Sequence, residues 1–169
     1  GDKHAGALNY SMYGAKAKIG NKKWSAYIAY NASNDQDNSD GGVTNTKLNG
    51  GFFNAWGADP AYTSSIFSRN AYRQDVSAYK IGGHYGIMKG LKVMVSHANY
   101  GKSKNTASGA TGLSTNSATE TDIVLVYKPT KAWMLKIFNA IRTSEFHDND
   151  TDGLGREQNH VRAVASYTF

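Results

Sequence analysis

The chain has 169 residues, no cysteine, two prolines, 18 glycines and 11 tyrosines, and its formal net charge at pH 7 is +6. Because cysteine is absent, a disulfide framework is excluded, and no run approaches the roughly 18 consecutive apolar residues of a transmembrane helix. Any membrane span must therefore consist of β-strands. The 19 lysines and arginines are scattered along the chain rather than clustered, which argues against a nucleic-acid partner.

Alternation of apolar and polar side chains with a period of two predicts about seven strands. They are expected at Ala7–Ile19, Lys22–Ala32, Gln74–Ile87, Leu91–Lys102, Thr119–Lys128, Ala132–Glu145 and Asn159–Phe169. The breaks between them alternate between tight turns at Gly20-Asn21, Met88-Lys89-Gly90 and Pro129-Thr130-Lys131 and long polar stretches at 33–73, 103–118 and 146–158. This alternation is typical of a barrel with short turns at one end and external loops at the other.

The two faces of most predicted strands can be assigned from the sequence. Since successive side chains point to opposite faces, Leu125 is expected on an apolar face and Val126 on the other. The phase of the first strand is unclear, because its apolar residues change parity near Met12-Tyr13, where a bulge would explain the change.

Aromatic residues end the apolar faces close to the tight turns. These residues are Trp24, Tyr85, Tyr127, Trp133 and Phe169. At one rim of a barrel they would form the aromatic girdle found where membrane meets water. The alternative is that they are core aromatics at strand ends.

The last predicted strand alternates up to an aromatic final residue, Phe169, as outer-membrane barrels do. If Phe169 lies at the rim of the tight turns, the seven strands are an odd number, whereas single-chain bacterial barrels have an even number. We therefore expect residues 1–169 to be the C-terminal part of a single barrel domain, with the rest of the barrel N-terminal to Gly1. An unrecognised eighth strand within 33–73 is the competing explanation.

The stretch Gly51–Val76, GFFNAWGADPAYTSSIFSRNAYRQDV, carries a family resemblance together with the two strands after it and the terminal HVRAVASYTF. It resembles the C-terminal part of the OprD-like outer-membrane porins and the related major porins of epsilonproteobacteria. The resemblance implies an eighteen-stranded, often homotrimeric barrel in the bacterial outer membrane, surrounded by lipid and lipopolysaccharide. It also implies a channel for small hydrophilic solutes, with a constriction loop nearer the N-terminus and outside this chain.

A set of basic residues is expected to line the water-filled side of this barrel wall. The candidate pore-lining residues are Lys80, His84, Lys92, Lys136, Arg142, His160 and Arg162, opposed by Asp122 as the one inward acid. Such a wall would favour anionic or carboxylate-bearing solutes, and it resembles the basic ladder of the OprD family. The alternative is that these cations pair with acidic groups elsewhere in the barrel.

One acidic cluster is a candidate structural calcium site. Asp148, Asp150 and Asp152 precede Gly153 at the spacing of the first half of an EF-hand loop. The match then fails, because the twelfth position is Asn159 rather than glutamate. Asp35, Asp37 and Asp40 form a weaker candidate, and a solvated polar loop is the default interpretation of both. No other cofactor is expected.

No catalytic motif is present in the sequence, so an enzyme is not expected. The alternative function is a surface adhesion or structural barrel that uses its long polar loops for binding. A soluble β-sandwich that binds ligands through its loops is the third interpretation.

Overall fold

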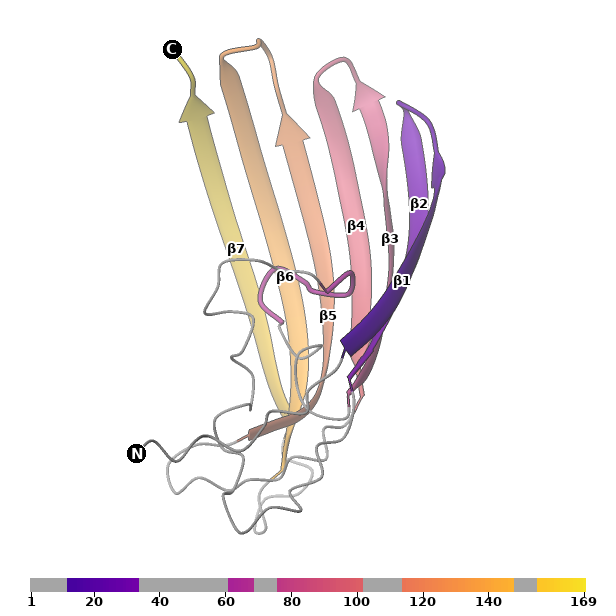
Figure 1. Cartoon of the computed structure of the whole chain (residues 1–169). Helices are drawn as coiled ribbons and strands as arrows, with labels where there is room; N and C mark the ends of the chain where they lie inside the picture. The colour runs from indigo at the N-terminus through magenta and orange to yellow at the C-terminus, as the bar shows by residue number, and fades with distance from the viewer. Residues whose placement is uncertain (1–11, 34–60, 69–75, 102–113, 148–154) are drawn as a thin grey trace, which may run out of the picture.

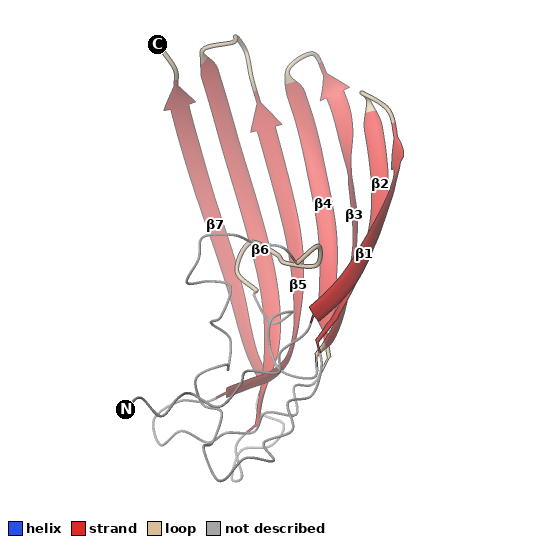
Figure 2. Ribbon diagram, viewed as in Figure 1, coloured by secondary structure: helices blue, strands red, loops and turns tan. Residues whose placement is uncertain are grey.

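A computed structural model describes residues 12–33, 61–68, 76–101, 114–147 and 155–169. Seven strands within these ranges form one antiparallel sheet and lie side by side in sequence order (Figure 1). The strands are β1 (Met12–Gly20), β2 (Trp24–Ser33), β3 (Ser77–Met88), β4 (Leu91–Tyr100), β5 (Ser114–Tyr127), β6 (Trp133–His147) and β7 (Gly155–Tyr167). The described residues include no helix, and hence none that could span a membrane (Figure 2). The prediction of an all-β chain with seven strands is confirmed for this part.

The largest difference from the predicted strands is at the start of β5. This strand begins at Ser114 rather than Thr119, because Ser114 and Ala118 pair with His147 and Ser144 of β6. Residues 114–117 are all polar and show no alternation, so their pattern does not indicate a strand.

The predicted bulge near Met12-Tyr13 is wrong for the described residues. The pairing of β1 with β2 runs without interruption from Met12 to Gly20. Register shifts occur elsewhere, at Gly86/Met88 in β3 and Thr115/Ser117 in β5. The uninterrupted register places Lys16 and Lys18 on the same face as Tyr27 of β2.

The tight turns lie together at one end of the sheet, at the top of Figure 1. In the first turn the Asn21 side chain accepts hydrogen bonds from the backbone N–H groups of Lys23 (2.8 Å) and Trp24 (3.1 Å). Gly90 closes the second turn with φ +81°, a conformation that residues with a Cβ rarely adopt. Thr130 Oγ1 accepts from Ala132 and Trp133 in the third turn. Local side-chain acceptors and the positive-φ glycines Gly20 and Gly90 thus fix the turns.

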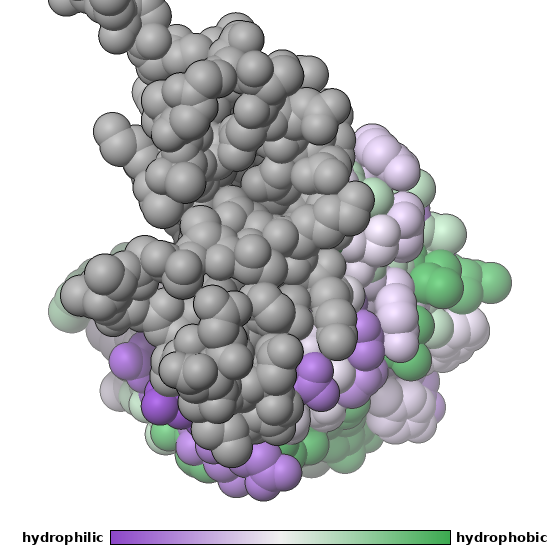
Figure 3. All heavy atoms as spheres, turned by 90° about the horizontal axis from the view of Figure 1, so that it is seen from below, coloured by the Kyte–Doolittle hydropathy of each residue, from purple (hydrophilic) through white to green (hydrophobic). Residues whose placement is uncertain are grey.

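One face of the sheet, called here the convex face, carries large apolar side chains that nothing in the described residues covers. Ile28, Ile81, Ile123, Leu125 and Ile137 are 58%, 50%, 42%, 37% and 50% exposed. In the view from the loop end, apolar side chains lie along parts of the outer boundary of the molecule (Figure 3).

Aromatic residues border the convex face toward both ends of the strands. Near the turns, the Trp133 and Tyr167 rings lie 5.0 Å apart, and Tyr167 is 5.0 Å from Phe169. Six residues farther along their strands, Tyr30 follows Trp24 and Tyr79 precedes Tyr85. The Tyr30 ring lies 6.4 Å from that of Tyr13. The sequence predicted the aromatic band near the turns but not the band that contains Tyr30 and Tyr79.

The opposite, concave face is covered in part by a short crossing segment, residues 61–68 (Figure 1, magenta). The segment is not a strand, and Ala61, Thr63, Ser65 and Ser68 are buried. The prediction that the whole break 33–73 is an external loop is therefore wrong for these residues. The physical reason is that polar side chains of the strands hydrogen-bond to this segment and hold it against the sheet. The remaining residues of that break lie outside the described ranges.

Candidate functional site

The crossing segment is held at its start by side chains of β2 and β4. Asn31 Oδ1 accepts hydrogen bonds from both the backbone N–H and the hydroxyl of Thr63, each 3.0 Å long. The Tyr100 hydroxyl donates to the Thr63 carbonyl at 2.6 Å. Asn31, Thr63 and Tyr100 are at most 2% exposed, so these contacts are shielded from water. Buried polar groups with paired partners fix a single position of the chain.

At its centre, the segment is held by a buried ion pair. Lys80 Nζ donates to the Ser64 carbonyl at 2.7 Å and to Ser65 Oγ at 3.1 Å, and it lies 3.7 Å from Asp122 Oδ2. The side chains of Lys80 and Asp122 are only 8% and 6% exposed. Lys80 therefore anchors the crossing segment and is shielded from water.

Two carboxylates of β5 accept consecutive backbone N–H groups of the segment. Asp122 Oδ2 accepts from Ile66 at 3.3 Å, and Glu120 Oε1 accepts from Phe67 at 2.8 Å. Glu120 is fully buried. The prediction that Asp122 is the one inward acid is therefore wrong, because Glu120 lies two residues away on the same strand and shares its face.

The end of the segment reaches β6 and β7. Arg142 Nε donates to Ser68 Oγ at 2.9 Å, and Arg142 Nη1 donates to Gln158 Oε1 at 3.1 Å. The Phe67 ring lies 4.3 Å from the His160 ring and 6.4 Å from that of Phe138. The segment thus contacts side chains of β2 through β7 and crosses nearly the whole described width of the sheet.

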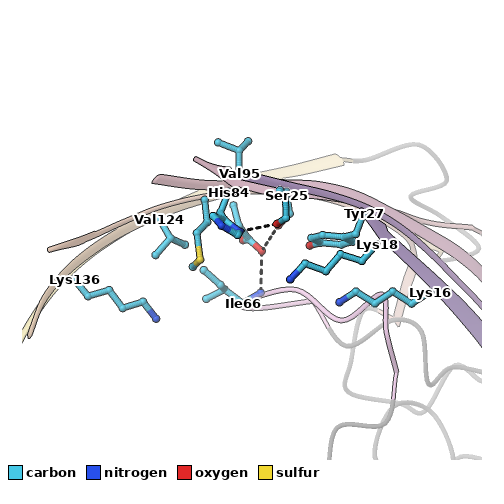
Figure 4. A pocket seen from close by; sticks show the side chains of 13 residues that line it. Lys16, Lys18, Ser25, Tyr27, Ile66, His84, Val95, Val124 and Lys136 are labelled. Carbon is cyan, nitrogen blue, oxygen red and sulfur yellow. Dashed lines mark hydrogen bonds between the residues drawn. The ribbon is translucent and has the colours of Figure 1, made fainter. Parts of the chain in front are cut away.

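A cavity of about 350 Å³ lies beside the segment on the concave face (Figure 4). Lysines reach it from opposite sides, Lys16 and Lys18 from β1 and Lys136 from β6. Ile66, Met94 and Val124 give it an apolar portion. Val95 points to the other face of the sheet in the same view.

Polar groups complete the wall of this cavity. Ser25 Oγ and His84 Nδ1 are 2.6 Å apart, and Lys16 Nζ lies 4.3 Å from the centre of the Tyr27 ring. Gly82 makes room for that ring, since an added Cβ would lie 2.8 Å from Tyr27 Cζ. The wall therefore combines ammonium groups with neutral hydrogen-bonding groups, a combination that suits weak contacts with anions.

The strand register places all seven predicted pore-lining residues on the concave face. The crossing segment contacts Lys80, Arg142 and His160, and His84 bonds Ser25. Lys92, His160 and Arg162 are exposed, whereas Lys136 is half-buried. Lys16 and Lys18 were not among the predicted pore-lining residues, because the sequence alone did not show which side chains of β1 share a face. The candidate calcium ligands Asp148, Asp150 and Asp152 lie outside the described residues, as do Asp35, Asp37 and Asp40.

Comparisons with known proteins identify no relative. No family model, no curated protein sequence and no solved structure matches this chain.

Proposed function

We propose that this chain forms part of the wall of a porin in the bacterial outer membrane, through which small hydrophilic solutes diffuse passively. The observation that carries the proposal is the division of one sheet into a bare apolar face and a charged face. The convex face meets lipid, and the concave face lines a water-filled channel.

The convex face supports a lipid environment. Proteins that are monomeric in water rarely leave large contiguous apolar surfaces uncovered. Here the apolar side chains of the middle of the strands lie between aromatic bands near Trp24 and Tyr85 at one level and Tyr30 and Tyr79 at the other. Aromatic girdles around an apolar band are the pattern of outer-membrane barrels.

The sheet needs further strands to complete such a barrel. β1 and β7 are the two edges of the described sheet, and an edge strand in lipid would leave backbone groups without hydrogen bonds. We propose that strands N-terminal to Gly1 pair with these edges. An eighteen-stranded, OprD-like barrel and a homotrimer surrounded by lipid and lipopolysaccharide belong to the same proposal, which the resemblance of Gly51–Val76 supports.

The crossing segment narrows the proposed channel. It crosses the concave face at mid-strand (Figure 1), where the backbone N–H groups of Ile66 and Phe67 bond to Asp122 and Glu120. The cavity lysines Lys16, Lys18 and Lys136 lie beside this narrowing. Because Asp122 and Glu120 are buried against the segment, the accessible charge of the concave face in the described residues is predominantly positive. The channel is therefore expected to favour anions and carboxylate-bearing solutes.

The first prediction tests this selectivity in planar bilayers with the purified intact protein, which includes the strands proposed to lie N-terminal to Gly1. At about 0.1 M salt the screening length is about 10 Å, so wall lysines should bias ion flux toward anions, and at about 1 M it is about 3 Å and the bias should fade. We expect the triple variant Lys16→Gln, Lys18→Gln and Lys136→Gln to move the reversal potential at low salt toward the value for a non-selective pore. Reversal potentials under a salt gradient measure the effect.

The matched control removes the same charge from the turns with Lys89→Gln, Lys128→Gln and Lys131→Gln. This control should keep more of the wild-type anion preference than the cavity variant. If both triple variants keep the wild-type reversal potential, the cavity lysines do not set selectivity. Folded protein that forms no channel would contradict the porin proposal and favour the adhesion or structural alternative.

A further inference from the structure

The two carboxyl groups that bind the crossing segment do so through one oxygen each. Glu120 Oε1 accepts from the N–H of Phe67 at 2.8 Å. Asp122 Oδ2 accepts from the N–H of Ile66 at 3.3 Å and from the Ser96 hydroxyl at 3.4 Å. The other two oxygens, Glu120 Oε2 and Asp122 Oδ1, are buried and have no hydrogen-bond partner among the described residues. A buried carboxylate oxygen without a donor is costly, so a donor is expected at both atoms.

The two carboxyl groups can supply this donor to each other. Glu120 and Asp122 are two residues apart in β5 and share the concave face, and their side chains lie within hydrogen-bonding reach of each other. Two ionised carboxylates are both acceptors and cannot form a hydrogen bond. A carboxyl group that keeps its proton has an O–H donor, so a single proton gives both free oxygens a partner.

The charges around the pair also leave room for one proton. Lys80 of β3 lies 3.7 Å from Asp122 Oδ2, whereas Glu120 forms no ion pair within the described ranges. Arg142 of β6 is opposite Glu120 in the register, but its Nε and Nη1 donate to Ser68 and Gln158. Two acids beside one ammonium group have one negative charge in excess, which one proton removes. The other titratable side chains that line the neighbouring cavity or contact the segment are Lys16 and Lys18 of β1, Tyr27 of β2, His84 of β3, Tyr100 of β4, Lys136 of β6 and His160 of β7.

We propose that Glu120 and Asp122 share one proton between Glu120 Oε2 and Asp122 Oδ1 while the crossing segment is docked, and that loss of this proton releases the segment. Two carboxyl groups in contact share a proton because like charges at such short range are not both ionised. When the segment leaves, water reaches both groups and each ionises. The docked state therefore holds one proton more than the released state, so docking weakens as the pH rises. This inference concerns the folded protein and does not depend on transport.

Infrared spectroscopy of the intact purified protein in detergent tests for the shared proton. A protonated carboxyl group has a C=O stretching band that a carboxylate lacks, and exposed carboxyl groups are ionised at about pH 7. The difference spectrum between the wild type and Glu120→Gln should contain this band, because the single acid left beside Lys80 ionises. The matched control Glu145→Gln removes an exposed glutamate of β6, and its difference spectrum should lack the band.

A thiol introduced by Ser65→Cys, at a buried position of the segment, measures release. Its rate of reaction with a water-soluble reagent is divided by that of an exposed thiol in Lys92→Cys, which removes the pH dependence of thiol chemistry itself. Between about pH 6 and about pH 9 this ratio should rise, by at most about tenfold per pH unit for one linked proton. Adding Glu120→Gln should abolish the rise, because an amide N–H then replaces the shared proton. Adding Glu145→Gln or His160→Gln should preserve it.

A wild-type protein without the carboxyl band would overturn the shared proton. A ratio that does not change with pH, or one that still rises after Glu120→Gln is added, would overturn its link to release. If Glu120→Gln does not fold, Asp122→Asn serves in both measurements, since its amide can donate to Glu120 Oε2 while its oxygen accepts from Ile66. Neither measurement involves conduction, so folded protein that forms no channels would contradict the porin proposal alone.

Discussion

Replacing Ile137 with arginine is expected to lower the free energy of unfolding in lipid vesicles by about 2–4 kcal/mol. Ile137 is half exposed on the convex face, four residues from Trp133 and therefore well inside the apolar band. An arginine there must either lose its hydration in hydrocarbon or distort the bilayer around it. Denaturant titrations of the variant in vesicles, with folding followed by its migration on gels without heating, measure this penalty.

Val164→Arg is the matched control for Ile137→Arg. Val164 is 38% exposed, and it pairs with Lys136 on the concave face of the neighbouring strand. Its arginine remains in water, and the contact with Lys136 should cost less than about 1 kcal/mol. Val126 also belongs to the concave face, but it is a poorer control. It is buried in a cluster with Val124 and Phe138, against which Ile66 packs. Equal penalties for the two variants would contradict the assignment of the faces.

Much of the sheet could be predicted from the sequence, because its strands face two different environments. Along Val161–Tyr167 every second side chain is apolar and the residues between them are polar except for Val164, and such alternation predicts both the strand and its faces. The predicted tight turns match the observed ones because Gly90, Asn21 and Thr130 have local roles in them. Local interactions of this kind can be read from a few neighbouring residues.

The crossing segment could not be predicted, because its position depends on distant partners. Thr63-Ser64-Ser65 has the composition of any exposed loop, yet its hydrogen bonds go to Asn31, Lys80 and Tyr100. The position of Glu120 on the concave face, in contrast, could have been predicted. Glu120 and Asp122 are two residues apart in the predicted strand and therefore share a face. The face of Lys16 and Lys18 required the pairing of β1 with β2.

Lys80 is the residue whose loss should loosen the crossing segment most. Lys80→Met keeps the length of the side chain but removes the ammonium group that lies between Asp122 and the segment. Asp122 then remains buried without a counter-charge, so we expect the free energy of unfolding to fall by about 3–5 kcal/mol. Lys92→Met, at an exposed position of the same face, should change it by less than about 0.5 kcal/mol.

A double-mutant cycle separates the ion pair from the general loss of a side chain. Asp122→Asn removes the negative charge and keeps an oxygen that can accept from Ile66, so the double variant should be less destabilised than the sum of the two single variants. Additive effects would show that Lys80 and Asp122 do not act as a pair.

Release of the segment itself can be measured with a single introduced thiol. Since the chain has no cysteine, Ser65→Cys provides one labelling site, at a position that is only 7% exposed. The thiol should react slowly with a water-soluble reagent in the otherwise unchanged protein and much faster when Lys80→Met is added, whereas Lys92→Met should leave the rate unchanged. A faster reaction together with higher single-channel conductance would mean that the Lys80 anchor holds the segment in the path of solutes. Unchanged labelling in Lys80→Met would mean that Asn31, Tyr100, Glu120 and Arg142 hold the segment without it.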